Sequence, residues 1–240
     1  MRSAFWVLPS SAVVLCLFGC GKSSGIDIPD LVPSGEAPKQ VDLTKIPPVG
    51  SKHTLKMQVE EREVDTGKTL LFSATEVEQM VDVQPDLVTS ESHMESAKIL
   101  HDDFRVNEAK LIAGVNADHH KLQFNKQGDY VSGELGKLQP TSYHFPSRPI
   151  STGNQWQGWK GVGKSKQVVL FNVDRLMKSK GHDIAQISYQ YNNRRGEVVL
   201  VKEWFDATSG WMVRSDETFA ISSRKKPATM TVREIDTAFE

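Results

Sequence analysis

Hydrophobic and polar residues alternate with a period of two from about residue 51, where we expect the folded body to begin. Residues 55–59 read LKMQV, a turn-like TGK follows at 66–68, and an apolar run restarts at 69–74. Because successive side chains of a strand point to opposite faces of a sheet, this spacing predicts strands with one buried face. The short turn between the two runs favours an antiparallel pair.

Longer β-type runs fill the second half of the chain, where short segments that favour chain reversal separate them. These runs cover residues 167–177, 184–192, 198–205, 211–222 and 230–235, and shorter ones cover 121–124 and 130–132. Consecutive strands joined by short turns form an antiparallel meander. Because the strands do not alternate with helices, we do not expect a parallel nucleotide-binding sheet.

Two segments in the first half are less distinct. Within residues 77–103, apolar side chains between 94 and 100 approximate helical spacing, and a strand pair fits that stretch almost as well. Residues 109–115 alternate apolar with polar or small side chains, which indicates a strand. The sequence therefore predicts a mainly β domain over residues 51–240, as a single curved antiparallel sheet or half-barrel. An α+β version with one helix is the open alternative.

The first 19 residues have the organisation of a secretion signal. Arg2 supplies a positive charge, an apolar stretch runs to Phe18, and the small residue Gly19 precedes Cys20. The apolar stretch is short for a membrane-spanning helix, which needs roughly 20 apolar residues. We therefore expect residues 1–19 to be a signal peptide that is removed on export, with an uncleaved N-terminal anchor as the alternative.

The segment Leu17-Phe18-Gly19-Cys20 resembles the lipobox of bacterial lipoproteins, in which a cysteine after a small residue receives diacylglycerol. This resemblance implies that Cys20 is lipidated, and that the lipid anchors the protein to a membrane of the cell envelope. A triacylated cysteine holds a protein stably because each buried CH₂ contributes about 0.8 kcal/mol. Gly21 follows the cysteine, and by resemblance to the sorting rule of enteric bacteria it favours the periplasmic face of the outer membrane.

Residues 20–50 connect that cysteine to the folded body. They contain five prolines and repeated Gly and Ser, a composition that precludes a regular helix or strand. We predict a flexible tether that holds the body clear of the lipid head groups. The alternative is that part of the segment packs along the domain as an ordered arm.

Composition and charge narrow the class of protein. The chain is 38% hydrophobic and 25% charged, as is typical of a folded globular protein. Its 29 basic and 30 acidic residues give a formal charge of −1, which provides no electrostatic footprint for nucleic acid. The two cysteines, Cys16 and Cys20, lie at the N-terminal edge, so the body contains no disulfide and no thiolate nucleophile.

Two aromatic motifs in the second half support a structural resemblance. Residues 143–146 read YHFP and precede GNQW at 153–156, and residues 204–211 read WFDATSGW. Together they are similar to a group of uncharacterised bacterial lipoproteins with a β-rich envelope domain. The turn in 204–211 also resembles a hairpin of lipoprotein-carrier half-barrels, where a curved sheet wraps a helix and an apolar cavity. The resemblance implies an apolar ligand and carries no reaction with it.

The residues of the WFDATSGW turn have a physical interpretation of their own. Gly210 permits the positive φ that closes a tight loop, and the Asp206 carboxylate can accept hydrogen bonds from the loop backbone. Trp204 and Trp211 flank the turn on facing strands, where we expect them to stack across it. A structural role is favoured over ligand binding for this turn.

The sequence gives only weak evidence for catalytic or metal-binding residues. Residues 101–103 (HDD) and 118–120 (DHH) carry the imidazole and carboxylate groups that zinc or manganese takes. Neighbouring strand residues point to opposite faces, so we favour solvated loops and expect no metal site. The string from Gly158 to Ser165 matches a phosphate-binding loop formally, but a strand-like run follows it instead of a helix. The charge runs at 60–63 and 224–226 are typical of solvated strand ends.

The sequence thus predicts a non-catalytic envelope lipoprotein that binds or carries an apolar ligand in a curved sheet. Four tryptophans are the candidate contacts: Trp156, Trp159, Trp204 and Trp211. We expect no enzyme activity, no cofactor and no nucleic-acid partner. A structural module that docks on another envelope protein is the alternative.

Overall fold

Twelve strands form one antiparallel sheet in the computed structural model, which describes residues 25–135, 139–221 and 226–240. In chain order the strands are β1 Lys52–Glu63, β2 Thr69–Val83, β3 Val88–Asp102, β4 His119–Phe124, β5 Tyr130–Glu134, β6 Thr141–Ser142, β7 Gln155–Lys160, β8 Gln167–Ser179, β9 His182–Asn192, β10 Val198–Asp206, β11 Met212–Ile221 and β12 Ala228–Asp236. One α-helix, α1 Glu108–Asn116, and short 3₁₀ turns at Gly163–Ser165 and Thr237–Phe239 complete the described elements. The signal peptide and Cys20 lie outside the described residues.

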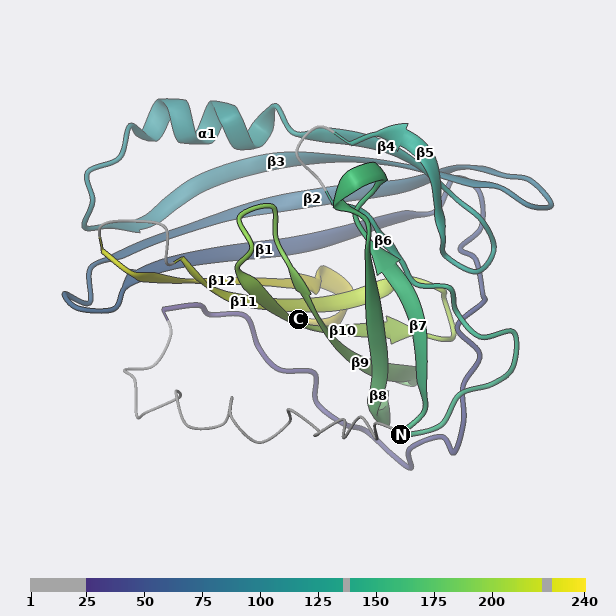
Figure 1. Ribbon diagram of the computed structural model, residues 1–240. Coiled ribbons are helices and arrows are strands. Elements are labelled where there is room, and N and C mark those ends of the chain that lie inside the picture. Colours follow the sequence, from purple (N-terminus) through teal and green to yellow (C-terminus); the bar gives the residue numbers. More distant parts are fainter. Residues whose placement is uncertain (1–24, 136–138, 222–225) are drawn as a thin grey trace, which may run out of the picture.

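The order across the sheet is β5-β4-β3-β2-β1-β12-β11-β10-β9-β8-β7-β6. First and last strands therefore pair in the middle of the sheet, and the two edge strands β5 and β6 follow one another in the chain. The sheet curls so strongly that these edges approach each other (Figure 1). The backbone N–H groups of Tyr143 and Phe145 donate to the carbonyls of Gly128 (3.1 Å) and Gln127 (2.7 Å), which joins the two ends of the curve. The prediction of a single curved antiparallel sheet is confirmed.

Strands β8 to β12 begin and end within two residues of their predicted bounds, whereas β6 and β7 were not predicted. In the stretch 77–103 the expected helix is wrong and its alternative, a strand pair, is correct: β2 and β3 pair across a turn at residues 84–87. The helix lies instead at Glu108–Asn116, so the prediction of a strand over 109–115 is wrong. A local interaction favours the helix at this position. The Asn107 side chain caps its first turn by accepting a hydrogen bond from the Lys110 N–H (2.9 Å).

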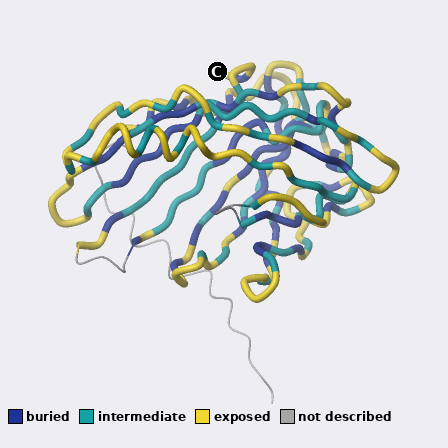
Figure 2. The backbone as a smooth tube through the Cα atoms, turned by 90° about the horizontal axis from the view of Figure 1, so that it is seen from above, coloured by how far each residue is buried: buried dark blue, intermediate teal, exposed yellow. Residues whose placement is uncertain are grey.

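The two faces of the sheet have different partners. On β1, the side chains of Gln58 and Glu60 accept hydrogen bonds from the backbone N–H groups of Asp27 (2.7 Å) and Gly25 (2.8 Å). We call this convex side the arm face. Leu55 and Met57, at alternating positions of the same strand, point to the opposite side, which we call the cavity face. Figure 2 shows burial concentrated on the central strands, with the helix and the hairpin tips exposed.

Residues 25–50 run along the body instead of extending away from it (Figure 1). Ile26, Ile28 and Leu31 are buried on the arm face, in a cluster with side chains such as Trp204 and Ile235. Further along, the segment turns to the end of the sheet, where Val41 and Leu43 join the main core. Residues 25–50 are thus an ordered arm, the alternative that the proline-rich composition left open. We call them the N-terminal arm.

The main core fills one half of the cavity face. Strands β7 to β10 contribute buried aliphatic side chains, and aromatic rings such as Phe145, Phe171 and Phe205 interlock with them. At the other end of the same face, Val115 of α1 packs against a smaller cluster that contains Met57 and Val59. Between these two packed regions the interior of the sheet is not filled by apolar side chains.

The arm also changes the interpretation of the charge run at 60–63. Glu60 and Glu61 are 5% and 8% exposed, so the prediction that this run is solvated is wrong. Arg62 donates to Glu60 Oε1 (2.8 Å), and the same oxygen accepts from the arm. The run holds the arm in place on β1. The other run, at 224–226, lies largely outside the described residues.

The β10–β11 turn has the structural role that was expected. Asp206 is 1% exposed, and its carboxylate accepts from the backbone N–H groups of Thr208 (2.7 Å) and Ser209 (3.2 Å) and lies 2.7 Å from His182 Nδ1. Gly210 has φ +87°, and a Cβ there would lie 2.4 Å from the Lys45 carbonyl of the arm. The turn therefore seats the arm as well as reversing the chain.

Replacing this buried carboxylate should cost stability. Asp206→Ala removes all the hydrogen bonds accepted by one buried charged group, and we expect the free energy of unfolding to fall by about 2–3 kcal/mol. Urea denaturation followed by tryptophan fluorescence measures the change. Asp65→Ala, on the exposed β1–β2 turn, is the control and should be nearly neutral. Equal midpoints for the two variants would contradict this role of Asp206.

Candidate functional site

A partly open cavity of about 370 Å³ lies on the cavity face between the main core and the smaller cluster. Strands β1 to β4 line one side, strands β10 to β12 form the floor, and residues 139–143 with Lys160 of β7 lie opposite. Apolar side chains contribute to the lining, among them Leu55, Met94, Met212 and Val232. The volume falls in the range of roughly 300–1,000 Å³ that is typical of small-molecule sites.

Five glutamates also line this cavity: Glu76, Glu78, Glu203, Glu217 and Glu234. We call them the carboxylate belt, because the pairing register carries them across adjacent strands. Glu76 of β2 lies opposite Leu55 of β1, Met57 of β1 lies opposite Glu234 of β12, and Ser215 of β11 lies between Glu234 and Glu203 of β10. The belt therefore follows the concave floor from β2 to β10.

The belt changes the protonation of its own members. Burial, with the neighbouring Glu76 charge, raises the pKa of Glu78 to about 7. Burial also raises the pKa of Glu203 to about 7, against the opposing effect of Lys160. Burial together with the other four belt glutamates holds the pKa of Glu234 well above its ordinary value. Each pKa is raised because ionised carboxylates in a low-dielectric environment lose hydration and repel one another.

A tyrosine and a lysine organise the β10 end of the belt. The Tyr189 hydroxyl donates to Glu203 Oε1 (2.8 Å). Burial and the Glu203 charge raise the pKa of Tyr189, so its hydroxyl remains a donor. Lys160, 7% exposed, donates to Thr141 Oγ1 (2.8 Å) and lies 4.7 Å from the Tyr191 ring centre. These contacts fix one wall of the cavity in a single arrangement.

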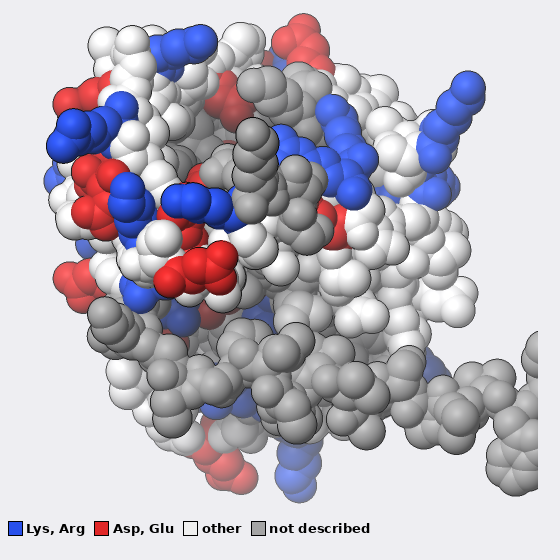
Figure 3. Space-filling view, turned by 60° about the vertical axis from the view of Figure 1, so that its left-hand side comes forward, with Lys and Arg blue, Asp and Glu red and all other residues white. Residues whose placement is uncertain are grey.

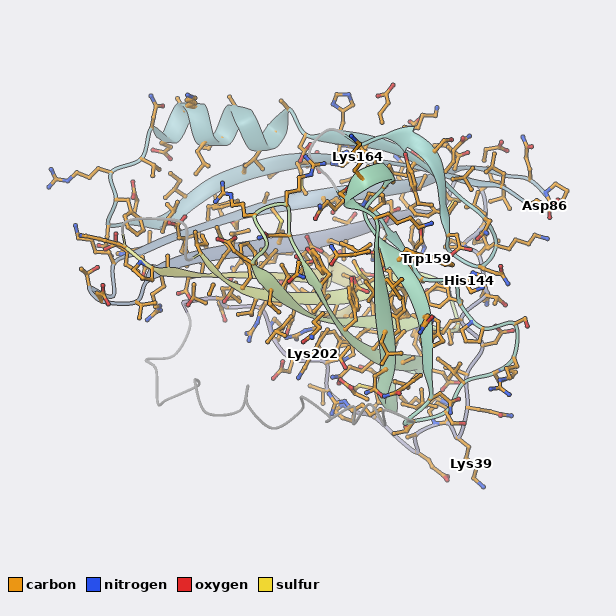
Figure 4. The ribbon with its side chains drawn as sticks, in the orientation of Figure 1. Lys39, Asp86, His144, Trp159, Lys164 and Lys202 are labelled. Carbon is orange, nitrogen blue, oxygen red and sulfur yellow. The ribbon has the colours of Figure 1, made fainter. Side chains whose placement is uncertain are left out.

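The structure does not bring the four candidate tryptophans together, and none of them lines this cavity. Trp156 packs in the main core against Phe171, and its Nε1 donates to the Tyr143 carbonyl (2.7 Å). Trp159 lies beside His144 (Figure 4). The Lys166 ammonium lies 4.5 Å from the centre of the Trp159 ring.

The two tryptophans of the β10–β11 turn do not stack across it, so that prediction is wrong. Trp204 is buried on the arm face, where the Arg214 guanidinium lies 4.9 Å from its ring centre. Trp211 instead stacks on His53, at a centre-to-centre distance of 4.9 Å. The turn offsets the two side chains because the register shifts between Trp204 and Phe205.

The two histidine clusters also remain separate. His101 pairs with Asp103 (3.0 Å) on the surface, while the Asp102 carboxylate accepts backbone hydrogen bonds from the turn that follows β3. His120 faces the cavity and lies 3.3 Å from Asp118, whereas His119 is exposed. Among the described residues, no three His, Cys, Asp or Glu side chains gather as the ligands of a metal ion would.

The carboxylate belt was not among the residues singled out by sequence. A signal for it exists in β10, where Val199, Val201 and Phe205 occupy the buried alternate positions and Glu203 stands at the remaining one. A glutamate within an otherwise apolar alternation marks either a register error or a polar cavity. The sequence alone does not distinguish these two cases. The structure does, because it shows that Glu203 borders a cavity.

The described residues thus define a β-sheet protein that is nearly closed around a cavity lined by both apolar side chains and glutamates. No protein-family model matches the sequence, and no curated protein matches it. One matching solved structure, from Nitrosomonas europaea and titled as an AttH protein, is 9% identical, with a TM-score of 0.19. The match covers 78% of this chain and 52% of that one, so this chain spans about half the length of that structure. Because the TM-score is so low, no property of that protein is assigned to this chain. None of the described helices is long and apolar enough to cross a membrane.

Proposed function

We propose that this protein is a non-catalytic envelope lipoprotein that binds or carries a ligand in the cavity of its curved sheet. The observation that supports the binding role is the unfilled volume of about 370 Å³ between two packed clusters on one face of the sheet. Leu55, Met94, Met212 and Val232 offer apolar contact to the body of such a ligand. Burying apolar surface there would contribute roughly 25 cal/mol per Å².

The binding role is tested by filling the cavity. Val232 of β12 lines the cavity, and its neighbour Thr231 points to the other face, so Val232→Trp and Thr231→Trp form a matched pair. Native mass spectrometry of the protein purified from its own membranes should show a bound small-molecule mass. We expect Val232→Trp to lose that mass and Thr231→Trp to keep it. An unmodified protein without bound mass would contradict the carrier role.

The proposed membrane anchor is based on the lipobox resemblance at Cys20. The N-terminal arm limits how far the body can lie from such an anchor. Gly25 is held against β1 by the hydrogen bond to Glu60, so only five Cα–Cα steps separate Cys20 from the body. Five extended residues span at most about 18 Å. A lipid on Cys20 would therefore hold the body close to the head groups, without a long free tether.

Replacing the lipidated residue tests this anchor directly. We expect Cys20→Ala to move the protein from the membrane fraction to the soluble fraction and to abolish incorporation of labelled palmitate. Cys16→Ala, within the signal, should change neither. Membrane association that survives in Cys20→Ala would show that something other than a lipid on this cysteine holds the protein.

The alternative function, docking on another envelope protein, draws support from a different surface. Val168, Leu170 and Val198 are 64%, 53% and 52% exposed on the arm-face side of β8 and β10. Exposed apolar side chains near one another are typical of interaction surfaces. Crosslinking in cells through a photoreactive residue at position 170 should capture a partner if this function holds.

A further inference from the structure

The interior of the cavity has an unbalanced charge. The carboxylate belt places five glutamates on its lining, and among the described residues that line it Lys160 is the one lysine or arginine. By contrast, acidic and basic side chains are interspersed on the molecular face shown in Figure 3. A concentration of like charge inside a sheet is costly, because each ionised carboxylate loses hydration and repels the others.

One belt member that lines the cavity has a buried acceptor without a hydrogen bond. Glu203 is 5% exposed and lines the cavity, and its Oε1 accepts from the Tyr189 hydroxyl. Its Oε2 is buried and has no hydrogen-bond partner among the described residues. The Lys160 ammonium donates to Thr141 and makes no hydrogen bond to this oxygen. A buried oxygen of this kind is costly unless a donor reaches it.

The spacing of the belt favours an organic cation over a metal ion. Adjacent strands lie about 4.8 Å apart, so carboxylates distributed from β2 to β10 extend over several strand widths. Among the described residues these carboxylates do not gather into a set of metal ligands. Apolar side chains such as Leu55, Met212 and Val232 share the same lining and suit a hydrocarbon body.

We propose that the cavity binds an organic amine with an apolar body, whose ammonium group donates hydrogen bonds to Glu203 Oε2 and is balanced by Glu234 and Glu217. This inference rests on the proposed function, which makes the cavity a ligand site, and it names the class of ligand. The amine provides the missing donor at Glu203 and the missing positive charge in the belt. Its apolar part contacts the aliphatic lining.

Binding of an amine is coupled to proton release. Glu78 faces the charges of Glu76 and His53 and the Ser90 hydroxyl. Glu203 faces the charges of Lys160 and Glu217, and the hydroxyls of Tyr189 and Tyr143 lie against the same carboxyl. Glu234 interacts with both carboxyls. Near neutral pH both carboxyls are partly protonated, because the pKa of each is raised to about 7. An ammonium ion in the belt favours their ionised form, so protons leave as the amine binds, and affinity rises with pH through the neutral range.

The experiment compares three ligands that differ only in their polar group: phenylbutylamine, phenylbutanol and phenylbutyrate. Calorimetry on the full-length protein in lipid nanodiscs should give an affinity for the amine at least tenfold above that for the alcohol, and no binding of the acid. Titrations in buffers of different ionisation enthalpy should show proton release with the amine alone. Glu203→Gln and Glu234→Gln should each lower the amine affinity at least tenfold and leave the alcohol affinity unchanged.

Two controls separate the possible failures. Glu95→Gln, an exposed glutamate on β3, should bind the amine like the unmodified protein. The thermal midpoint of ligand-free Glu234→Gln should rise above that of the unmodified protein, which shows that lost binding is not lost folding. Equal binding of amine and alcohol would overturn the amine proposal and leave the carrier role standing. Failure of all three probes, with no bound mass in the native protein, would overturn both.

Discussion

The free energy of unfolding of the ligand-free protein is expected to fall by a few kcal/mol as the pH rises from about 5 to 8. Glu78 and Glu203 carry this dependence, because burial raises the pKa of each from 4.5 to about 7. A group whose pKa is higher in the folded state than in the unfolded state stabilises the fold while it is protonated. That contribution is complete below 4.5 and is lost as the pH passes through 7, at up to about 1.4 kcal/mol per pH unit for each group. Glu234 has a raised pKa as well and adds to the same trend.

Carboxylates with the opposite shift titrate outside this window. Burial alone would raise the pKa of Asp236, but hydrogen bonds from His53 and from the Ala238 N–H lower it below its ordinary value of 3.8. Its contribution is therefore present above 3.8 and is lost as the pH falls below that value. Between pH 5 and 8 we assign the slope to the belt, because the raised pKa of its carboxyls makes the folded state bind more protons than the unfolded state in that range.

Urea denaturation at intervals across that pH range measures the prediction. The unmodified protein should lose stability steadily, whereas Glu203→Gln and Glu78→Gln should each flatten the curve, because a glutamine cannot ionise. The double variant should flatten it further. A curve that is flat in the unmodified protein, or equally steep in the double variant, would show that the belt is not buried as the structure has it.

Most of the sheet could be predicted from sequence, and the reason is visible in β8 to β12. In β8 and in the first half of β10 the buried positions alternate with more exposed ones, so the period of two is strong there. The helix α1 could not be predicted in the same way. Its Ala and Leu residues happen to alternate, and the deciding feature is the Asn107 cap, a single side-chain hydrogen bond that period counting ignores.

The N-terminal arm shows another limit of composition. Its prolines do exclude a regular element, as expected, but an extended chain can still pack by inserting single side chains. Ile26, Ile28 and Leu31 do so on the arm face. Apolar residues scattered irregularly through a proline-rich segment do not form a recognisable pattern. The arm becomes predictable only when the sheet that receives it is known.

The candidate site was the least predictable feature, because a cavity is a property of curvature. Aromatic residues favoured the tryptophans as ligand contacts, but those rings pack against the core, the arm and exposed polar groups. The belt glutamates lie on four strands, of which β2 is far in sequence from the consecutive strands β10 to β12. Their common location depends on the β1–β12 pairing, which joins the two ends of the chain.

The second large effect concerns Arg214, which we expect to contribute about 3–5 kcal/mol to stability. This residue is fully buried on the arm face, and its guanidinium donates to both carboxylate oxygens of Asp216, at 3.1 and 2.9 Å. It also donates to the Pro29 carbonyl and lies 2.9 Å from Asp30 of the arm. Because one planar group makes all these contacts above the Trp204 ring, its removal releases the arm and leaves Asp216 without its main partner.

Arg214→Met keeps the length and the apolar stem of the side chain and removes the charge and the donors, so it isolates these interactions. We expect its denaturation midpoint to fall sharply, and we expect limited proteolysis to cut within residues 25–34 before it cuts the sheet. Arg195→Met, on the exposed β9–β10 turn, is the matched control and should resemble the unmodified protein. If Arg214→Met lost stability while the arm stayed resistant to protease, the loss would belong to the sheet alone. The arm would then be held by Ile26, Ile28 and Leu31, and the short connection to Cys20 would rest on apolar packing rather than on this buried cation.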